Sequence, residues 1–325
     1  MQRGIMDIIH HLKWEINGLL IKEEKMWKQR SRTLWLHKGD QNTRFFHSRA
    51  SHRHRQNRIM ELENLDGVLF LDEEEITNIL VTYYHRLFNS TIPQNLEEAL
   101  AAVPELISDV MNSLLTAEYV KAEVDEALKH MELLKAPVPD GLPPLFFQKF
   151  WSSIGEEISQ AVLTCLNSSC IPSSINCIFI TLIPKVKSPS KVSEFRPIAL
   201  CNTIYKLVSK VITNRFKKVL FNIISESQSA FQFDKAISDN ILIAFEMLHH
   251  MKTQKSKKAD FMTLKLDMSK AYDRVKWQFL IKIMKKMGFC EAWIKFIFNC
   301  VSTVSYSILV NGELKGDIVL TREIQ

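Results

Sequence analysis

Residues 177–220 read CIFITLIPKVKSPSKVSEFRPIALCNTIYKLVSKVITNRFKKVL and pass from a strand pattern into a helix pattern. The first eight residues, 177–184, form an apolar run rich in β-branched residues that ends at a proline, and this pattern predicts a short buried strand. A helix is expected over residues 199–221, because apolar residues recur on one face and basic residues on the other. Its inward face comprises Leu200, Ile204, Leu207, Val208, Val211 and Ile212, and its polar face Lys206, Lys210, Arg215, Lys217 and Lys218.

The same kinds of pattern predict further elements on both sides of this stretch. Asp66-Gly67 suggests a turn between two short strands within residues 59–71, and Asn311-Gly312 suits a type I′ turn between strands 306–310 and 313–319. The expected fold class is therefore α+β and helix-rich. Helices are expected at 5–35, 72–90, 96–114, 116–134, from about 145, and at 238–251.

Composition excludes several classes of protein. The chain has 325 residues, of which 46% are hydrophobic and 24% charged, which is ordinary for a globular protein. The N-terminus lacks the apolar run of a secretory signal, and no stretch is long enough to span a bilayer. Six scattered cysteines without a zinc-finger spacing favour a reducing, intracellular environment, nuclear or cytoplasmic.

Charge is distributed unevenly along the chain. Residues 22–58 hold eleven basic and three acidic side chains, whereas residues 72–132 hold three basic and thirteen acidic ones. Residues 133–325 are again basic, with twenty-six basic against fifteen acidic side chains. This distribution suggests that part of the chain binds a polyanion, although solvated helix faces would also account for it.

Basic and aromatic residues alternate in the segment 30–58. Cationic groups for phosphates beside aromatic faces for bases are what a binder of single-stranded or structured RNA uses. The alternative is a basic helix whose aromatic residues form its buried face. The candidate nucleic-acid-binding residues are Arg30, Arg32, Trp35, Lys38, Arg44, Phe45, Phe46, Arg53 and Arg55.

A candidate site for phosphoryl transfer lies in FMTLKLDMSKAYDRVKW, residues 261–277. Residues 261–267 are expected to be extended, with Met262, Leu264 and Leu266 on one face and Asp267 at the C-terminal end of the other. A helix is expected after Asp273. Each carboxylate also has a structural interpretation, Asp267 as a turn or cap residue and Asp273 as a helix N-cap.

Five stretches in this order resemble the reverse transcriptases of plant non-LTR (LINE-type) retrotransposons. The resemblance runs from about Trp27 to about Gly316. The stretches are WLHKGDQNTRFFH at 35–47, KAPVPDGLPPLFFQKFW at 135–151, LIPKVKSPSKVSEFRPIALCNTIYKLVSKVITNRFKKVL at 182–220, SESQSAF at 225–231 and LKLDMSKAYDRVKW at 264–277.

The resemblance implies RNA-directed DNA polymerase activity, a nucleotidyl transfer that uses two Mg²⁺ or Mn²⁺ ions. Asp267 matches the first metal-binding aspartate, beside the carbonyl of Met268, and Asp273 matches a further acidic position at the catalytic site. Tyr272 matches the aromatic residue under the incoming sugar, and Lys185 and Arg196 match residues that contact the nucleotide triphosphate. The implied partners are an RNA template, a DNA primer and dNTPs, with no membrane.

The resemblance also implies a right-hand polymerase fold with fingers and a partial palm, preceded by a helical basic segment. The expected domains are a helical basic linker at 1–58, a hairpin with an acidic helical region at 59–134, and fingers with an incomplete palm at 135–325. Residues 59–134 and the basic linker leave two other functions open, namely a non-catalytic RNA- or DNA-binding remnant and a helical interaction protein.

The sequence departs from the family pattern at several positions. After Asp273 the acidic residues are Glu291, Glu313, Asp317 and Glu323, so the adjacent aspartates of the second metal-binding motif are missing. Val138 replaces the first glycine of the usual KAPGPDG stretch. Because two converging carboxylates are needed to hold two metal ions, we expect this truncated polypeptide to be inactive as a polymerase on its own.

Overall fold

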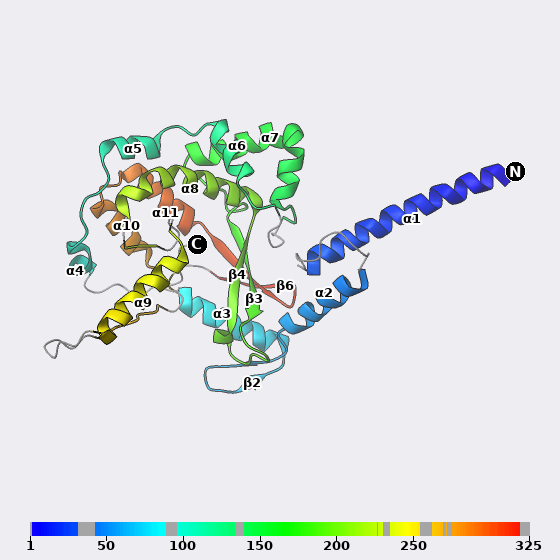
Figure 1. The fold of residues 1–325 in the computed structure, drawn as a ribbon, viewed down its shortest axis with the longest axis horizontal. Coiled ribbons are helices and arrows are strands. Elements are labelled where there is room, and N and C mark those ends of the chain that lie inside the picture. The colour runs from blue at the N-terminus through cyan, green and yellow to red at the C-terminus, as the bar shows by residue number, and fades with distance from the viewer. Residues whose placement is uncertain are drawn as a thin grey trace. The chain divides into compact units, whose positions relative to one another are not determined.

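The structure is a computed structural model that describes residues 2–31, 43–88, 96–133, 140–225, 227–229, 235–253, 262–268, 271 and 275–318. Figure 1 shows its helices and strands in chain order, and they confirm a helix-rich α+β fold. The chain divides into two compact units. Unit 1 comprises residues 1–80, 180–198 and 308–315, and unit 2 comprises residues 81–179, 199–307 and 316–325.

Unit 1 begins with two helices that pack on each other, α1 (Gln2–Ser31) and α2 (Thr43–Asn57). Strands β1 (Leu62–Glu63) and β2 (Leu69–Phe70) follow as an antiparallel pair, with Leu62 opposite Phe70. Gly67 closes their turn at a φ of +79°, where a residue with a Cβ would be strained. The first predicted hairpin is therefore confirmed.

A four-stranded sheet has the order β4-β3-β5-β6. Its strands are β3 (Cys177–Pro184), β4 (Phe195–Cys201), β5 (Ser305–Val310) and β6 (Glu313–Ile318). Every second residue of β3 is buried from Ile178 to Leu182, as predicted for this strand. Asn311 and Gly312 join β5 to β6 with φ values of +53° and +99°, which confirms the type I′ prediction.

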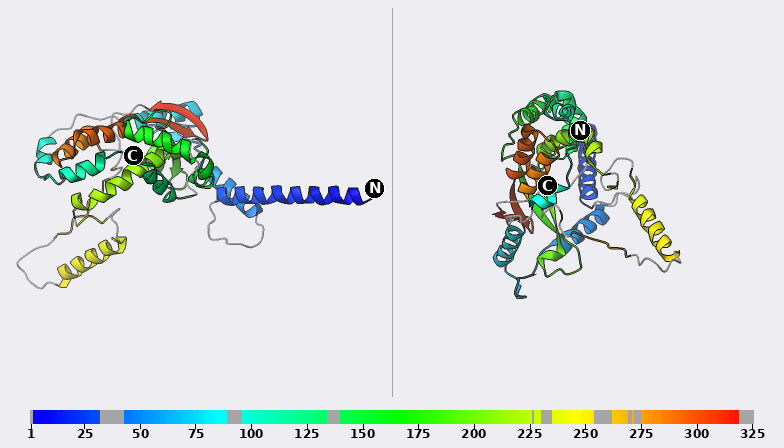
Figure 2. Two further views of the ribbon diagram at one scale, coloured as in Figure 1. Left: turned by 90° about the horizontal axis from the view of Figure 1, so that it is seen from above. Right: turned by 90° about the vertical axis from the view of Figure 1, so that its left-hand side faces the viewer.

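Unit 2 contains the larger hydrophobic core, in which α6, α7 and α8 pack on one another and α10 packs on α11. In Figures 1 and 2 these helices form a group with α5. Val124 of α6, Val162 of α7, Val208 of α8 and Ile294 of α11 are all at most 3% exposed. The helices are α3 (Glu73–Phe88), α4 (Leu96–Ala101), α5 (Asp109–Thr116), α6 (Lys121–Lys129), α7 (Pro144–Asn167), α8 (Thr203–Ile223), α9 (Ile237–Thr253), α10 (Trp277–Lys286) and α11 (Glu291–Ser302).

Three predicted helix boundaries were wrong. The helix expected at 96–114 is split into α4 and α5, because residues 102–108 are non-helical around Pro104, which cannot donate a helical hydrogen bond. The helix expected at 116–134 is reduced to α6. The helix expected from residue 199 begins at Thr203, because residues 195–201 extend as β4. No helix within the described part of the chain is long and apolar enough to cross a bilayer.

A buried arginine ties the turn between α5 and α6 to α8. Arg215 is 4% exposed, and its Nε and Nη2 donate to the two carboxylate oxygens of Glu123 at 3.0 and 2.6 Å. Its other hydrogens reach the carbonyls of residues 115, 117 and 118, and its guanidinium lies 3.4 Å from the ring centroid of Tyr119. Burial raises the pKa of Tyr119 to about 12. The charge is therefore fully enclosed by acceptors and an aromatic face.

We expect Arg215→Met to lower the free energy of unfolding by about 2–3 kcal/mol, because the half-buried carboxylate of Glu123 and the carbonyls that Arg215 contacts would lose their donor. Urea denaturation followed by circular dichroism measures this. Arg86→Met is the matched control, since Arg86 is exposed on α3 and its replacement should cost at most about 0.5 kcal/mol. Equal losses in the two variants would contradict this interpretation of Arg215.

Candidate nucleic-acid interface and nucleotide-transfer residues

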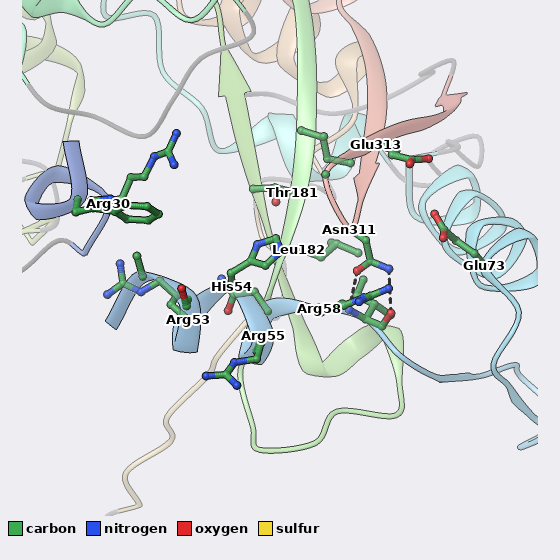
Figure 3. Close-up of a pocket in the computed structure, with 17 residues that line it drawn as sticks. Arg30, Arg53, His54, Arg55, Arg58, Glu73, Thr181, Leu182, Asn311 and Glu313 are labelled. Atoms are coloured by element: carbon green, nitrogen blue, oxygen red, sulfur yellow. Dashed lines mark hydrogen bonds between the residues drawn. The ribbon is translucent and has the colours of Figure 1, made fainter. Parts of the chain in front are cut away.

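Unit 1 contains a pocket of about 940 Å³, which we call the basic pocket. Figure 3 shows α1 and α2 on one side of it, and a strand and the β5–β6 hairpin on the other. Its lining includes the apolar residues Ile59, Leu182 and Leu309. Four arginines line the pocket together with His54, namely Arg30, Arg53, Arg55 and Arg58. Such a surface attracts phosphates, and its aromatic and apolar parts can contact bases.

Ring contacts join α1 to α2 at the edge of this pocket. Trp27 meets His47 edge to face with ring centroids 4.2 Å apart, and the guanidinium of Arg30 lies 5.3 Å from the centroid of the Trp27 ring. Phe46 is only 1% exposed, so its ring lies on the buried face of α2 and stabilises the packing of this helix. The last turns of α1 and the basic helix α2 thus form one wall of the pocket.

Asn311 connects the end of α2 to the tip of the β5–β6 hairpin. Its Oδ1 accepts a hydrogen bond from the amide of Ile59 at 2.9 Å, and its Nδ2 donates to the Ile59 carbonyl at 3.1 Å. Both backbone groups of a 4% exposed residue are thereby satisfied. Figure 3 draws both bonds beside the pocket. The sequence identified Asn311 only as a turn residue, and nothing in its pattern indicated this bond pair.

The candidate nucleic-acid residues have different locations in the structure. Arg30, Arg53 and Arg55 line the basic pocket, whereas Arg44 is exposed on α2 without lining it. Phe45 is half-buried, and the buried Phe46 offers no free face for a base, in line with the alternative interpretation of the aromatics. Arg32, Trp35 and Lys38 lie outside the described residues. Trp27, His54 and Arg58 line the pocket but were not singled out, although the run RHRQNR at 53–58 carries the signal.

Two carboxylates that line the pocket form ion pairs with the same lysine. Lys315 Nζ lies 3.1 Å from Glu313 and 3.6 Å from Glu73, and both acids line the pocket. The hydrogen bond and charge of Glu313, followed by those of Glu73, raise the pKa of Lys315. This pairing offsets negative charge that would otherwise repel a phosphate entering between the arginines.

Lys185 lies at the start of a hydrogen-bonded loop between β3 and β4. Its amide donates to the carbonyl of Glu194 at 2.8 Å, and its Nζ donates to the carbonyl of Ser193 at 2.7 Å. The Glu194 carboxylate accepts from the amides of Ser190 and Lys191 at 2.9 and 3.1 Å, and these bonds lower the pKa of Glu194. Arg196 follows on β4 with an exposed side chain.

The segment around Asp267 differs from its prediction. Residues 262–268 form no strand, so the strand expected to end at Asp267 is wrong, and Met262 and Leu266 are 85% and 84% exposed. Asp267 and Met268 are also exposed. Tyr272 and Asp273 lie outside the described residues.

The described residues contain no group of three side chains that could hold a metal ion. Two-metal chemistry requires at least two converging carboxylates. Within the described segment 262–268, Asp267 has no second carboxylate beside it. This segment on its own therefore does not complete a two-metal site.

Comparison with known proteins finds a family model that matches part of this chain. Residues 183–322 match the family model for reverse transcriptase (RNA-dependent DNA polymerase). This segment contains Lys185, Arg196 and Asp267. The chain resembles the reverse transcriptases of LINE-type retrotransposons. The family model that matches is thus one for an RNA-dependent DNA polymerase.

Three curated relatives belong to mobile elements. The transposon TX1 uncharacterized 149 kDa protein of Xenopus laevis is 27% identical over 91% of this chain and 22% of its own length. A retrovirus-related Pol polyprotein from a type-2 retrotransposable element of Drosophila melanogaster is 20% identical over 76% of this chain and 22% of its own. One from a type-1 element of Bradysia coprophila is 24% identical over 48% of this chain and 15% of its own. The chain thus spans less than a quarter of the length of each of these relatives.

We expect Asn311→Gly to expose the Ile59 amide to hydrogen exchange, because glycine keeps the positive φ but removes both side-chain bonds. The loss should lower the local opening free energy by about 1–3 kcal/mol. Asn311→Asp is the matched control, since its carboxylate still accepts from the Ile59 amide. Unchanged Ile59 exchange in the glycine variant would show that the bond pair does not hold this junction.

Acidification should release the loop that follows Lys185. Because the folded-state pKa of Glu194 is lowered, its stabilising effect is complete above the ordinary glutamate value of 4.5 and is lost as pH falls through the lower, folded-state pKa. An NMR titration of the Ser190 and Lys191 amides should therefore have a midpoint below 4.5. Glu194→Gln should abolish the transition, and a midpoint at or above the ordinary value would contradict the assignment.

Proposed function

We propose that this chain supplies the fingers and part of the palm of a LINE-type reverse transcriptase, with the basic pocket holding template RNA. The observation that carries this proposal is the family match over residues 183–322, which includes each described residue proposed to act in nucleotide transfer. The resemblance to plant elements and the division at 1–58, 59–134 and 135–325 are part of the same proposal.

The nucleotide-transfer roles are those that the resemblance to LINE-type reverse transcriptases implies, and the chemistry of the residues suits them. Lys185 supplies a point charge and Arg196 a planar fork for the triphosphate of an incoming dNTP. Asp267 and the Met268 carbonyl supply oxygen ligands of the kind that Mg²⁺ or Mn²⁺ takes. Tyr272 would pack under the sugar, and Asp273 adds an acidic group. A bound divalent ion would offset the charge on the reacting phosphate oxygens.

The basic pocket supports RNA binding for a separate reason. Arg53 and Arg55 are two residues apart on α2, and both line the pocket together with Arg30 and Arg58. The lining combines these guanidinium groups with Trp27 and several apolar residues. Phosphate-binding and base-contacting surfaces in one cavity suit a single strand, whose bases are free to leave the stack. We therefore assign the pocket to unpaired template RNA, held without a need for metal.

We expect the 325-residue polypeptide to bind single-stranded RNA with an affinity that falls steeply with salt. The double variant Arg53→Gln/Arg55→Gln should reduce the slope of log K against log[salt] by roughly 1.4, at about 0.7 for each phosphate that is no longer neutralised. Arg86→Gln, on exposed α3, is the control and should leave the slope unchanged. Absence of RNA binding at low salt would contradict the pocket's assignment and favour a helical interaction protein.

The same polypeptide should show no primer extension on an RNA template in Mg²⁺ or Mn²⁺. No two acidic residues are adjacent after Asp273, so the 325 residues lack the aspartate pair of the second metal-binding motif. Incorporation of labelled dNTP measures this. Clear extension that Asp267→Asn abolishes would contradict the expectation and show that the second metal is held by other groups.

A further inference from the structure

Two cysteines lie at the C-terminal end of α7, within unit 2. Cys165 belongs to the last helical turn, and Cys170 lies just beyond the end of the helix at Asn167. Both carry free thiols, but Cys165 is only 5% exposed, whereas Cys170 is open to solvent. This helix end therefore holds one thiol that a solute can reach and one that it cannot.

The backbone closes α7 with a Schellman motif that joins these two cysteines. Ser169 adopts a φ of +53°, in the left-handed region that such a motif needs. The amide of Cys170 donates to the carbonyl of Cys165 at 3.2 Å, and the amide of Ser169 donates to the carbonyl of Leu166 at 3.3 Å. In this motif the first and last residues commonly make a side-chain contact. Here cysteines occupy both of those positions.

The two cysteines are close enough to be bridged. A disulfide needs Cα atoms no more than roughly 7 Å apart, and the direct backbone hydrogen bond of 3.2 Å keeps the Cα atoms of Cys165 and Cys170 within about that distance. Burial, and after it the charge of Cys170, raise the pKa of the Cys165 thiol. The thiols therefore also interact electrostatically, as neighbouring groups do.

Neighbouring elements hold this turn in place. Asn299 of α11 donates from its Nδ2 to the carbonyl of Ser169 at 3.1 Å. The side chain of Asn167 accepts from the amide of Tyr119 at 2.8 Å and donates to the carbonyl of the same residue at 3.3 Å. The fold therefore presents the two cysteines in a fixed arrangement, so linking them costs little further conformational entropy.

We propose that Cys165 and Cys170 form a reversible oxidation site, in which an oxidant attacks Cys170 and Cys165 then closes a disulfide across the end of α7. The disulfide would fix the turn to which α11 is bonded through Asn299. This site stands independently of the polymerase assignment and of RNA binding by the basic pocket.

Exposure sets the order of the two steps. Hydrogen peroxide, as a two-electron oxidant, transfers an oxygen atom to the Sγ of Cys170, which gives a sulfenic acid and one water. The Sγ of Cys165 then attacks the Sγ of Cys170. The S–S bond forms, the S–O bond breaks, and the hydroxyl leaves as a second water with the proton of the Cys165 thiol. Two thiols are thereby oxidised and one peroxide is reduced.

Differential alkylation of the folded full chain after brief treatment with hydrogen peroxide tests the proposal. Iodoacetamide blocks the remaining thiols, and N-ethylmaleimide labels the thiols that reduction releases. Trypsin leaves Cys165, Cys170 and Cys177 in one peptide, residues 150–185, so the three compete within it. Cys170 should pair with Cys165 in preference to Cys177 by at least ~10-fold, because reaction depends on which thiol has access. Unfolding in urea should remove this preference.

Three variants separate the roles. Cys170→Ser removes an exposed thiol without disturbing the core and should leave Cys165 reduced. Cys165→Ser, with its fold checked by circular dichroism, should leave Cys170 as a sulfenic acid that dimedone traps. Cys290→Ser, at the N-cap of α11, is the matched control and should leave the disulfide intact. Pairing of Cys170 with Cys177, oxidation of Cys170 with Cys165 still reduced, or unchanged oxidation of Cys165 in Cys170→Ser would overturn the proposal.

Discussion

The hydrogen-bond pair between Asn311 and Ile59 is the constraint on which the basic pocket depends. It joins positions separated by 252 residues in sequence, with distances of 2.9 and 3.1 Å. Asparagine is well suited to both tasks at this position, because it tolerates a positive φ and also carries a donor and an acceptor. The turn residue Asn311 thereby holds the segment that follows α2 against the β5–β6 hairpin.

Electrostatics in unit 1 is organised around that junction. Guanidinium groups from α1 and α2 line the pocket, and Lys315 offsets the two carboxylates that line it as well. In the β3–β4 loop, by contrast, Lys185 donates its ammonium hydrogen to a backbone carbonyl and Glu194 orders the backbone. The two regions therefore use charge differently, one as an open cationic lining and the other as support for a local loop.

The sequence predicted the elements whose signal is local. β3 follows from its apolar run, and the Asn311-Gly312 hairpin follows from its turn chemistry, and the structure confirms both. It mispredicted elements in which a competing signal was present. Pro104 interrupts an otherwise helical pattern, and residues 195–201 pair as a strand because of their neighbours in the sheet. The candidate site was partly predictable, since the basic composition of residues 30–58 indicated Arg30, Arg53 and Arg55. The bond pair between Ile59 and Asn311 was not predictable, because it joins residues far apart in sequence and produces no periodic pattern of residue types.

The enclosed Arg215 has a consequence for how the chain folds. Its acceptors lie 92 to 100 residues earlier in sequence, so α8 meets them only after a long loop has closed. Removing a guanidinium from water before those acceptors arrive is costly. Burial of Arg215 is therefore expected to come after helix α8 has formed, as the turn between α5 and α6 docks onto it. The rate of this late step would depend on sequence separation more than on the stability of either helix.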